Sequence, residues 1–147
     1  MGSLESAINT RELLKLGITH ILDVSSVEYY KRVKYFQYNS VPVYNNHDED
    51  IKKFFRITNR FIEEAINNKE PKKNGKVLIQ GEKGTSRAPS FAIAYLINNK
   101  RITFKEAISM VTSKMAVVEI NDYFKKQLED YDLGKLATVS KEKQEKN

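Results

Sequence analysis

The sequence predicts an α/β domain with a central, mostly parallel sheet flanked by helices. Short apolar segments typical of strands alternate with segments of helical periodicity, and residues 77–80 (VLIQ) are apolar up to the last position, as a buried central strand is. The chain has 147 residues, which suits one domain, and its 40% of hydrophobic residues are enough for a single core.

The first part of the chain reads as a short helix followed by two strands. Residues 9–16 are predicted to form a helix that ends at Gly17, since glycine readily takes the left-handed conformation of a C-cap. Residues 18–25 (ITHILDVS) and 35–43 (YFQYNSVPV) are the predicted strands. Pro42 places the end of the second strand at an edge or a bend.

A long amphipathic helix is predicted after the second strand. Asp50 is its predicted N-cap, and apolar residues follow at the spacing of one helical face. The members of this stripe are Ile51, Phe54, Phe55, Phe61, Ile62, Ala65 and Ile66. Residues 67–75 are polar and are predicted to turn the chain toward the strand at 77–80.

Three more helices are predicted after that strand. Residues 87–99 are apolar on most faces, which indicates a central helix, and Pro89 falls in the first turn, where its missing N–H costs little. Thr103 and Glu106 have the spacing of a capping box, and Asn121 is the predicted cap of the last helix. The residues predicted to face the core from the last two helices are Phe104, Ala107, Ile108, Val111, Phe124, Leu128 and Tyr131.

Composition excludes several kinds of site. The chain has no cysteine, so it has no disulfide, no thiolate metal site and no thiol nucleophile. With His20 and His47 as its only histidines, we expect no metal site and no cofactor. We find no long apolar run and no signal peptide, and therefore expect no membrane association. We expect a monomer in the cytoplasm, with the nucleus as the alternative compartment.

The charge favours anionic partners. The net charge is +6 and the isoelectric point is near 9.4, which suits phosphoproteins, acidic docking peptides or RNA, and equally suits an ordinary solvated surface rich in lysine. Residues 134–147 are rich in lysine and have no apolar periodicity. We therefore predict a domain over residues 1–133 and a basic, disordered tail over residues 134–147.

The segment 77–89 (VLIQGEKGTSRAP) contains the candidate site. A strand that leads through a short loop into a central helix directs several backbone N–H groups into one concavity, at the positive end of the helix dipole. Arg87 adds a planar fork of donors, and Gly84 permits a positive φ or a close approach to an anion. The residues predicted to bind phosphate are Gly81, Glu82, Lys83, Gly84, Thr85, Ser86 and Arg87.

Two other interpretations of this loop are an ATP-binding loop and a purely structural turn. An ATP-binding loop requires Gly-x-x-x-x-Gly-Lys-Ser/Thr, and the order Lys83-Gly84-Thr85 does not match it. A purely structural turn between a strand and a helix stays open on spacing alone. For a phosphate-binding loop we expect Glu82 to point away from the cavity, because backbone lines the inner surface of such loops.

The loop resembles the His-Cys-x5-Arg-Ser/Thr signature of cysteine-dependent protein tyrosine and dual-specificity phosphatases. The small dual-specificity group fits best, with its run Val-Leu-Val-His-Cys-x-x-Gly-x-Ser-Arg-Ser. Segments 2–9, 16–22 (LGITHIL), 38–43 (YNSVPV), 94–96 and 121–128 also resemble this family, in the same order. The likeness covers nearly the whole chain. The family's first strand normally precedes Gly2, so we expect a compact or truncated domain.

The resemblance implies that four catalytic positions are changed. Gly81 stands at the nucleophilic cysteine and Gln80 at the histidine before it. Ala88 stands at the hydroxyl residue after the arginine, and Asn45 at the general-acid aspartate. The loop residues that match the family signature are Gly84, Ser86 and Arg87. We therefore expect no catalytic residue and no phosphatase activity.

Three carboxylates near Asn45 are candidates for a substitute acid. Asp50 is assigned to the helix cap, and Asp48 and Glu49 are expected to be solvated. Even with a substitute acid, the chain would still have no nucleophile.

Glycine at the cysteine position is also found in the STYX-type pseudophosphatases that this chain resembles. That resemblance implies binding of phosphorylated or kinase-pathway proteins without hydrolysis, with a phosphate or sulfate ion held in the loop. The alternative is a scaffold with a vestigial pocket, which would bind partners through the tail, residues 31–34 or the basic face of Lys52, Lys53, Arg56 and Arg60. RNA binding ranks lower, because Tyr29-Tyr30-Lys31-Arg32 is the only aromatic and basic cluster.

Overall fold

The computed structural model describes residues 1–3, 9–27, 32–70 and 74–146. Within these residues, three strands form one parallel sheet in the order β2-β1-β3. The strands are β1 (His20–Asp23), β2 (Gln37–Ser40) and β3 (Val77–Gln80). Ile21 of β1 is in register with Tyr38 of β2 and with Leu78 of β3. The predicted α/β class with a parallel sheet is confirmed.

The helices of the described chain begin near the predicted caps. They are α2 (Thr10–Lys15), α3 (Lys52–Ile66), α4 (Arg87–Lys100), α5 (Phe104–Thr112) and α6 (Asp122–Glu145). The capping box of Thr103 and Glu106 is present, and Asn121 accepts the N–H of Phe124. Asp50 accepts the N–H of Lys52, although the helix boundary lies one residue later than predicted.

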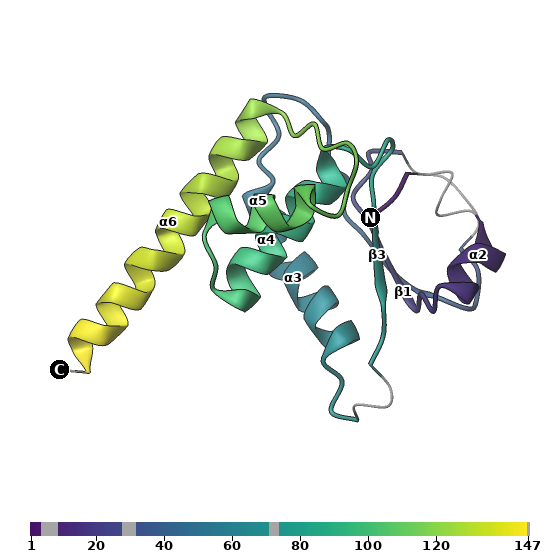
Figure 1. Cartoon of the computed structure of the whole chain (residues 1–147), viewed down its shortest axis with the longest axis horizontal. Helices are drawn as coiled ribbons and strands as arrows, with labels where there is room; N and C mark the ends of the chain where they lie inside the picture. The colour runs from purple at the N-terminus through teal and green to yellow at the C-terminus, as the bar shows by residue number, and fades with distance from the viewer. Residues whose placement is uncertain (4–8, 28–31, 71–73, 147) are drawn as a thin grey trace.

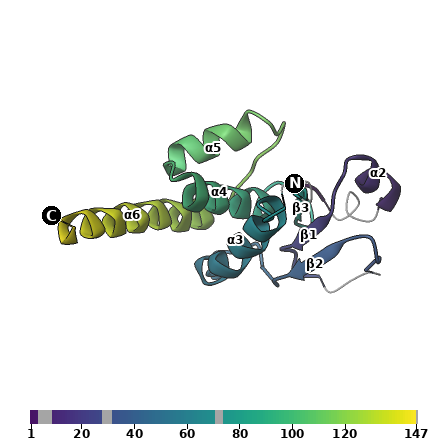
Figure 2. The same ribbon diagram turned by 90° about the horizontal axis from the view of Figure 1, so that it is seen from below.

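Both faces of the sheet are covered by helices, because successive side chains of a strand point to opposite faces. Ile21 and Leu78 pack with Leu13 of α2. Leu22 and Ile79 belong to the larger core that α3 and α4 also form. Figures 1 and 2 show α2 on one side of the sheet and the other helices on the opposite side. The strand predicted at 77–80 is therefore covered on both faces, but the prediction that it is central is wrong for the described residues. The middle strand is β1, and β3 lies at the edge, where Gly2 forms an isolated bridge with Gln80.

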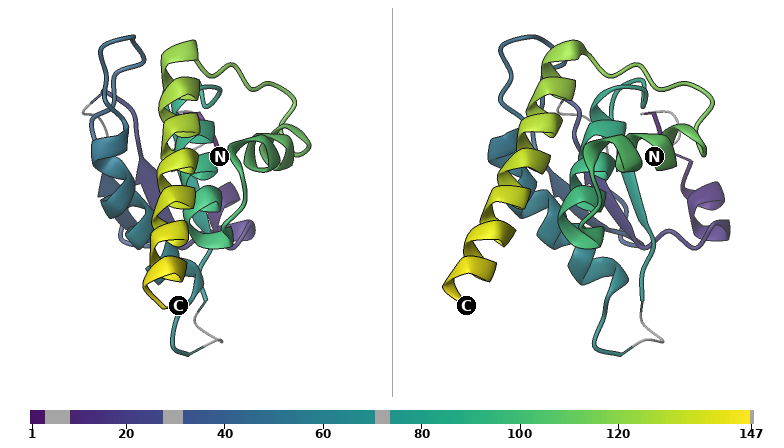
Figure 3. Two further views of the ribbon diagram at one scale, coloured as in Figure 1. Left: turned by 90° about the vertical axis from the view of Figure 1, so that its left-hand side faces the viewer. Right: turned by 60° about the vertical axis from the view of Figure 1, so that its left-hand side comes forward.

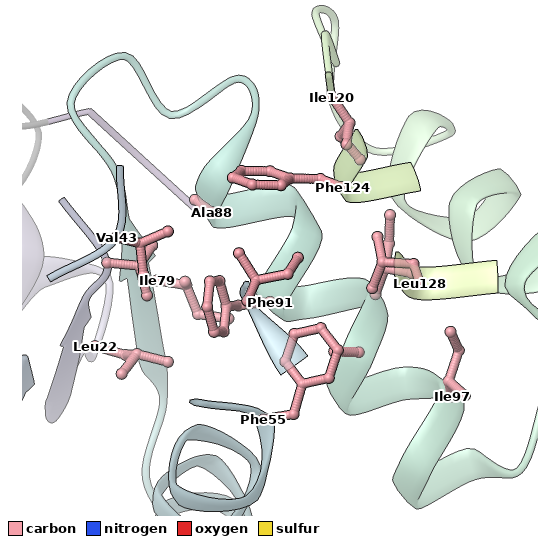
Figure 4. Packing of buried hydrophobic residues seen from close by; sticks show 14 of the residues in the cluster. Leu22, Val43, Phe55, Ile79, Ala88, Phe91, Ile97, Ile120, Phe124 and Leu128 are labelled. Carbon is pink, nitrogen blue, oxygen red and sulfur yellow. The ribbon is translucent and has the colours of Figure 1, made fainter. Parts of the chain in front are cut away.

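Helix α4 lies at the centre of the larger core and packs against α3, α5, α6 and β3. Phe91 of α4 is fully buried, and its ring meets the ring of Phe55 edge-on at 5.6 Å between centroids. Figure 4 shows Phe124 and Leu128 of α6 on the side of α4 away from the sheet. The central helix that the sequence predicts is thus found, and it fixes the loop that precedes it.

Residues 134–147 were predicted to form a disordered tail. In the structure α6 continues to Glu145, so residues 134–145 are helical. Its C-terminal part extends beyond the other helices (Figures 2 and 3). Lysine, glutamate, glutamine, leucine and alanine dominate residues 134–145, and all have high helix propensity. Lys141 and Glu145 also have the spacing of an ion pair along a helix. Neither α6 nor any other helix in the described part of the chain is long and apolar enough to cross a membrane.

Candidate phosphate-binding site

The loop between β3 and α4 lines an open pocket of about 250 Å³. All seven residues predicted to bind phosphate line this loop pocket together with Asn45: Gly81, Glu82, Lys83, Gly84, Thr85, Ser86 and Arg87. Within the described residues, the backbone N–H groups of residues 82–86 donate to no other group. They lie at the positive end of α4, so they remain available to an anion.

Gly84 allows a close approach between the loop and the N-terminal segment. Its φ is +76°, and a Cβ there would lie 2.7 Å from the carbonyl carbon and oxygen of Gly2. Gly2 donates its N–H to the Ile79 carbonyl at 3.0 Å and accepts the Gly81 N–H at 3.2 Å. Gly2 therefore pairs alongside β3 and lies against the loop. Gly84 is expected from the sequence to permit a positive φ, and the backbone has a positive φ there.

Arg87 is held in place by contacts within the domain. The residue is 7% exposed, and its Nη1 donates to the Val43 carbonyl at 2.7 Å and to Ser26 Oγ at 3.3 Å. Its Nε lies 3.9 Å from the point that a Cβ on Gly81 would occupy. The Nε edge of the guanidinium therefore faces the base of the loop pocket at Gly81.

The prediction that Glu82 points away from the cavity is wrong. Its carboxylate accepts from Arg87 Nη2 at 3.1 Å and from Ser26 Oγ–H at 2.6 Å. These hydrogen bonds, the one from Arg87 foremost, hold the pKa of Glu82 below its usual range, so Glu82 is ionised at neutral pH. The physical reason is that the buried guanidinium needs a counter-charge, and Glu82 supplies one.

Asn45 presents amide donors where the resemblance places the general acid. Its Oδ1 accepts from Ser86 Oγ–H at 2.9 Å and from Asn121 Nδ2 at 3.0 Å. The orientation of Asn121 is fixed, because its own Oδ1 accepts the N–H of Phe124 at 2.8 Å. The Oδ1 of Asn45 is thereby occupied, and its Nδ2 has no partner within the described residues. Asn45 can donate a hydrogen bond to an anion in the pocket that it lines, but it cannot protonate a leaving group.

Of the other changed positions, Gly81 lines the pocket and two do not. Gln80 and Ala88 are fully buried and do not line it. A Cβ added at Gly81 would meet Arg87 Cβ at 3.5 Å and the Ala88 nitrogen at 3.6 Å, which are ordinary van der Waals distances. Gly81 therefore leaves room for a Cβ atom at the position of the nucleophile.

The three carboxylates weighed as substitute acids do not line the loop pocket. The prediction that Glu49 is solvated is wrong, since its side chain is only 9% exposed. It accepts the N–H of Tyr44 at 3.1 Å and pairs with Lys53 at 3.3 Å. Glu49 thus ties the segment that contains Asn45 to the start of α3.

Comparisons with known proteins identify the family. The family described as "Dual specificity phosphatase, catalytic domain" matches residues 1–133. The chain belongs to the dual-specificity phosphatase family. A probable dual specificity protein phosphatase of Dictyostelium discoideum is 34% identical over 133 residues, which is 90% of this chain and 32% of that protein. The mouse serine/threonine/tyrosine-interacting protein is 29% identical over 147 residues, covering 95% of this chain and 64% of that protein. This dual-specificity phosphatase domain thus spans about a third of the Dictyostelium relative.

Solved dual-specificity phosphatase structures share the fold. The human tyrosine phosphatase-like serine/threonine/tyrosine-interacting protein is 29% identical, with a TM-score of 0.82 over 92% of this chain and 91% of that one. Human DUSP28 is 26% identical, with a TM-score of 0.84 over 94% and 93%. A mouse putative dual specificity phosphatase complexed with zinc tungstate is 28% identical, with a TM-score of 0.84 over 94% and 84%.

Sequence reasoning missed three contributors to this dual-specificity phosphatase site. Ser26 contacts both Glu82 and Arg87, the Val43 carbonyl anchors Arg87, and Asn121 orients Asn45. A signal existed for Ser26, because it follows β1, and the carboxyl ends of adjacent parallel strands meet at one edge of the sheet. Asn121 was identified only as a helix cap, and a backbone carbonyl leaves no trace in a sequence.

Proposed function

We propose that this domain is a pseudophosphatase that binds phosphorylated tyrosine, threonine or serine segments of proteins through loop 81–87 without hydrolysing them. Such a domain would act as a regulator or scaffold in kinase and phosphatase signalling. The observation that carries the proposal is the position of Arg87, which is buried, anchored by Val43 and Ser26, and directed with its Nε edge at the base of the pocket.

The absence of catalysis follows from the chemical groups available. The whole chain contains no cysteine, so the covalent route through a phosphocysteine is closed. Asn45 cannot act as a general acid, and loss of such an acid alone costs about 10²–10⁴ in rate. Uncatalysed hydrolysis of phosphate monoesters is among the slowest reactions known, so the remaining electrostatics would not give measurable turnover.

Binding of a phosphate dianion is supported by the donors around the pocket. Residues 82–86, Arg87 and Asn45 line it, and they carry free backbone N–H groups, the Nε of a guanidinium and an amide Nδ2 as donors. A thiolate is missing from its base, and asparagine is neutral where an aspartate would become anionic. Both differences reduce repulsion of a dianion. Tungstate, the oxyanion complexed with the mouse relative, has the tetrahedral shape of phosphate and is a suitable probe.

Arg87→Ala is expected to weaken binding of a phosphotyrosine peptide by about 10- to 100-fold. The estimate follows from the loss of charge-assisted hydrogen bonds, each worth about 1.5–3 kcal/mol. Isothermal titration measures it, with the unphosphorylated peptide as the reference. Arg87→Lys keeps the charge and loses the planar fork, so it should be intermediate. Arg11→Ala, a matched change on the exposed surface of α2, should have no effect.

Equal affinity of wild type and Arg87→Ala, or equal affinity for phosphorylated and unphosphorylated peptide, contradicts the proposal. Either outcome favours the scaffold with a vestigial pocket.

Glu82→Gln is expected to raise the affinity for phosphate or tungstate at neutral pH by about tenfold. The substitution removes a negative charge from the pocket and weakens the contact that occupies Arg87 Nη2, which together are worth on the order of 1–2 kcal/mol. Because the pKa of Glu82 is lowered, its ion pair persists above the usual glutamate pKa and is lost only as pH falls through the lower value. The gain should therefore be constant from pH 6 upward. A loss of affinity would show that Glu82 serves mainly to position Arg87.

A further inference from the structure

Glu82 provides the only carboxylate among the described residues that line the loop pocket. Its side chain is 34% exposed, so it is open to a ligand even though Arg87 and Ser26 hold it. The positive charges on the lining belong to Lys83 and Arg87. A carboxylate in a phosphate site repels the phosphate unless the ligand also brings a positive charge.

Arg87 presents one edge of its guanidinium both to this carboxylate and to the pocket. Glu82 accepts from Nη2 at 3.1 Å, whereas Nε faces the base of the pocket and donates to no group within the described residues. Nε and Nη2 are the two parallel donors along one edge of a planar guanidinium. A phosphate oxygen that binds Nε would therefore lie beside the Glu82 carboxylate, and the two anions would share one cation.

The charge of Glu82 stays in the pocket when phosphate binds. Its Oε1 accepts from Ser26 Oγ–H at 2.6 Å, independently of the contact between its Oε2 and Arg87. These hydrogen bonds, the one from Arg87 foremost, hold the pKa of Glu82 below its usual range. With a phosphate dianion bound, the lining would carry three negative charges against the two positive charges of Lys83 and Arg87. The positive end of α4 adds only about half a charge, so the occupied pocket remains negative.

We propose that Glu82 makes the loop pocket select phosphorylated segments in which an arginine or lysine directly flanks the phosphorylated residue. This inference rests on the proposed function and names the class of segment that the site takes. The cation of the segment pairs with the exposed part of the Glu82 carboxylate, which has acceptor sites beyond those that Arg87 and Ser26 use. The net charge of the chain is +6, so the charge of the whole protein favours the opposite choice of sequence. A preference for a basic neighbour must therefore come from a local group.

The test compares two phosphotyrosine peptides of equal length, titrated calorimetrically against the whole chain. One has arginine on both sides of the phosphotyrosine, and the other has citrulline there, which has the length of arginine but no charge. The wild-type chain is expected to bind the arginine peptide about two- to fivefold more tightly at low salt, and the preference should shrink as salt is added.

Two charge-removing variants locate the source of the preference. Glu82→Gln should bind the citrulline peptide more tightly than the wild type does, and it should show no preference for arginine. Glu119→Gln is the matched control, because Glu119 is exposed and its N–H donates to the Thr85 carbonyl of the loop at 2.8 Å. This control removes the same charge beside the pocket and should keep the full preference.

The inference and the proposed function fail through different results. Equal affinity of the two phosphopeptides for the wild type, or a preference that persists in Glu82→Gln or disappears in Glu119→Gln, overturns the inference. Binding that still depends on phosphate and on Arg87 would leave the proposed function standing in each of these cases. If the unphosphorylated arginine peptide binds as tightly as its phosphorylated form, both are overturned.

Discussion

Restoring the four changed positions together, as Gly81→Cys, Gln80→His, Ala88→Ser and Asn45→Asp, is expected to produce turnover of an aryl phosphate. The backbone at Gly81 accepts a side chain without strain, because a Cβ there makes only van der Waals contacts. Arg87 and the free N–H groups of the loop would lower the pKa of the new thiol and hold the phosphate in line with it.

The surroundings of Asn45 also favour recovered turnover in the restored variant. Aspartate has nearly the shape of asparagine, so its carboxylate can keep the hydrogen bonds that Asn45 accepts from Ser86 and Asn121. Gly81→Cys alone should therefore form a phosphocysteine slowly and fall below the fourfold variant by about 10²–10⁴ in kcat/KM.

Steady-state assays with an aryl phosphate measure the recovery, and a burst of product identifies the covalent intermediate. Adding Arg87→Ala to the restored protein is the control and should abolish activity. A folded fourfold variant without turnover would indicate that the loop does not hold phosphate in a reactive geometry. Turnover by the wild-type chain would contradict the assignment as a pseudophosphatase.

Replacing Phe91 with alanine is expected to lower the free energy of unfolding by about 3–5 kcal/mol. The side chain is fully buried at the centre of the core, and its edge-on contact with Phe55 adds to the loss. Small domains are stable by only about 5–15 kcal/mol, so a large part of the total would disappear. Phe91 lies one turn beyond the loop on α4, and the variant should also bind anions less well.

Denaturation in urea, followed by circular dichroism, measures this change. Ile57→Ala is the control on the neighbouring helix α3, because Ile57 is 51% exposed and should contribute less than about 0.5 kcal/mol. A loss below about 1 kcal/mol at Phe91 would be too small for a cavity at the centre of the core.

The parts of the site that are contiguous in the sequence could be predicted, and the parts that depend on side-chain direction could not. A buried strand, a loop and a central helix follow from the apolar pattern of residues 77–99, and they place seven residues on one pocket. Glu82 was placed wrongly because its direction is set by the burial of Arg87, which depends on Val43 and Ser26 from distant segments.

Helix starts could be predicted where a capping residue marks them, whereas the end of the last helix could not. The capping box at Thr103 and the cap at Asn121 are local and were predicted. The helix over residues 134–145 was missed because the prediction relied on an apolar stripe, whereas helix propensity and charge spacing extend a helix that Phe124 and Leu128 already anchor.

The close approach of Gly2 to Gly84 has a practical consequence for experiments on this protein. Gly2 is hydrogen-bonded to both sides of the strand-to-loop junction. An affinity tag fused before Met1 would therefore emerge beside the pocket and could add its own charges or histidines to the measured anion affinity. The far end of α6 extends away from the other elements and offers a better attachment point for tags, dyes or surface coupling (Figure 1).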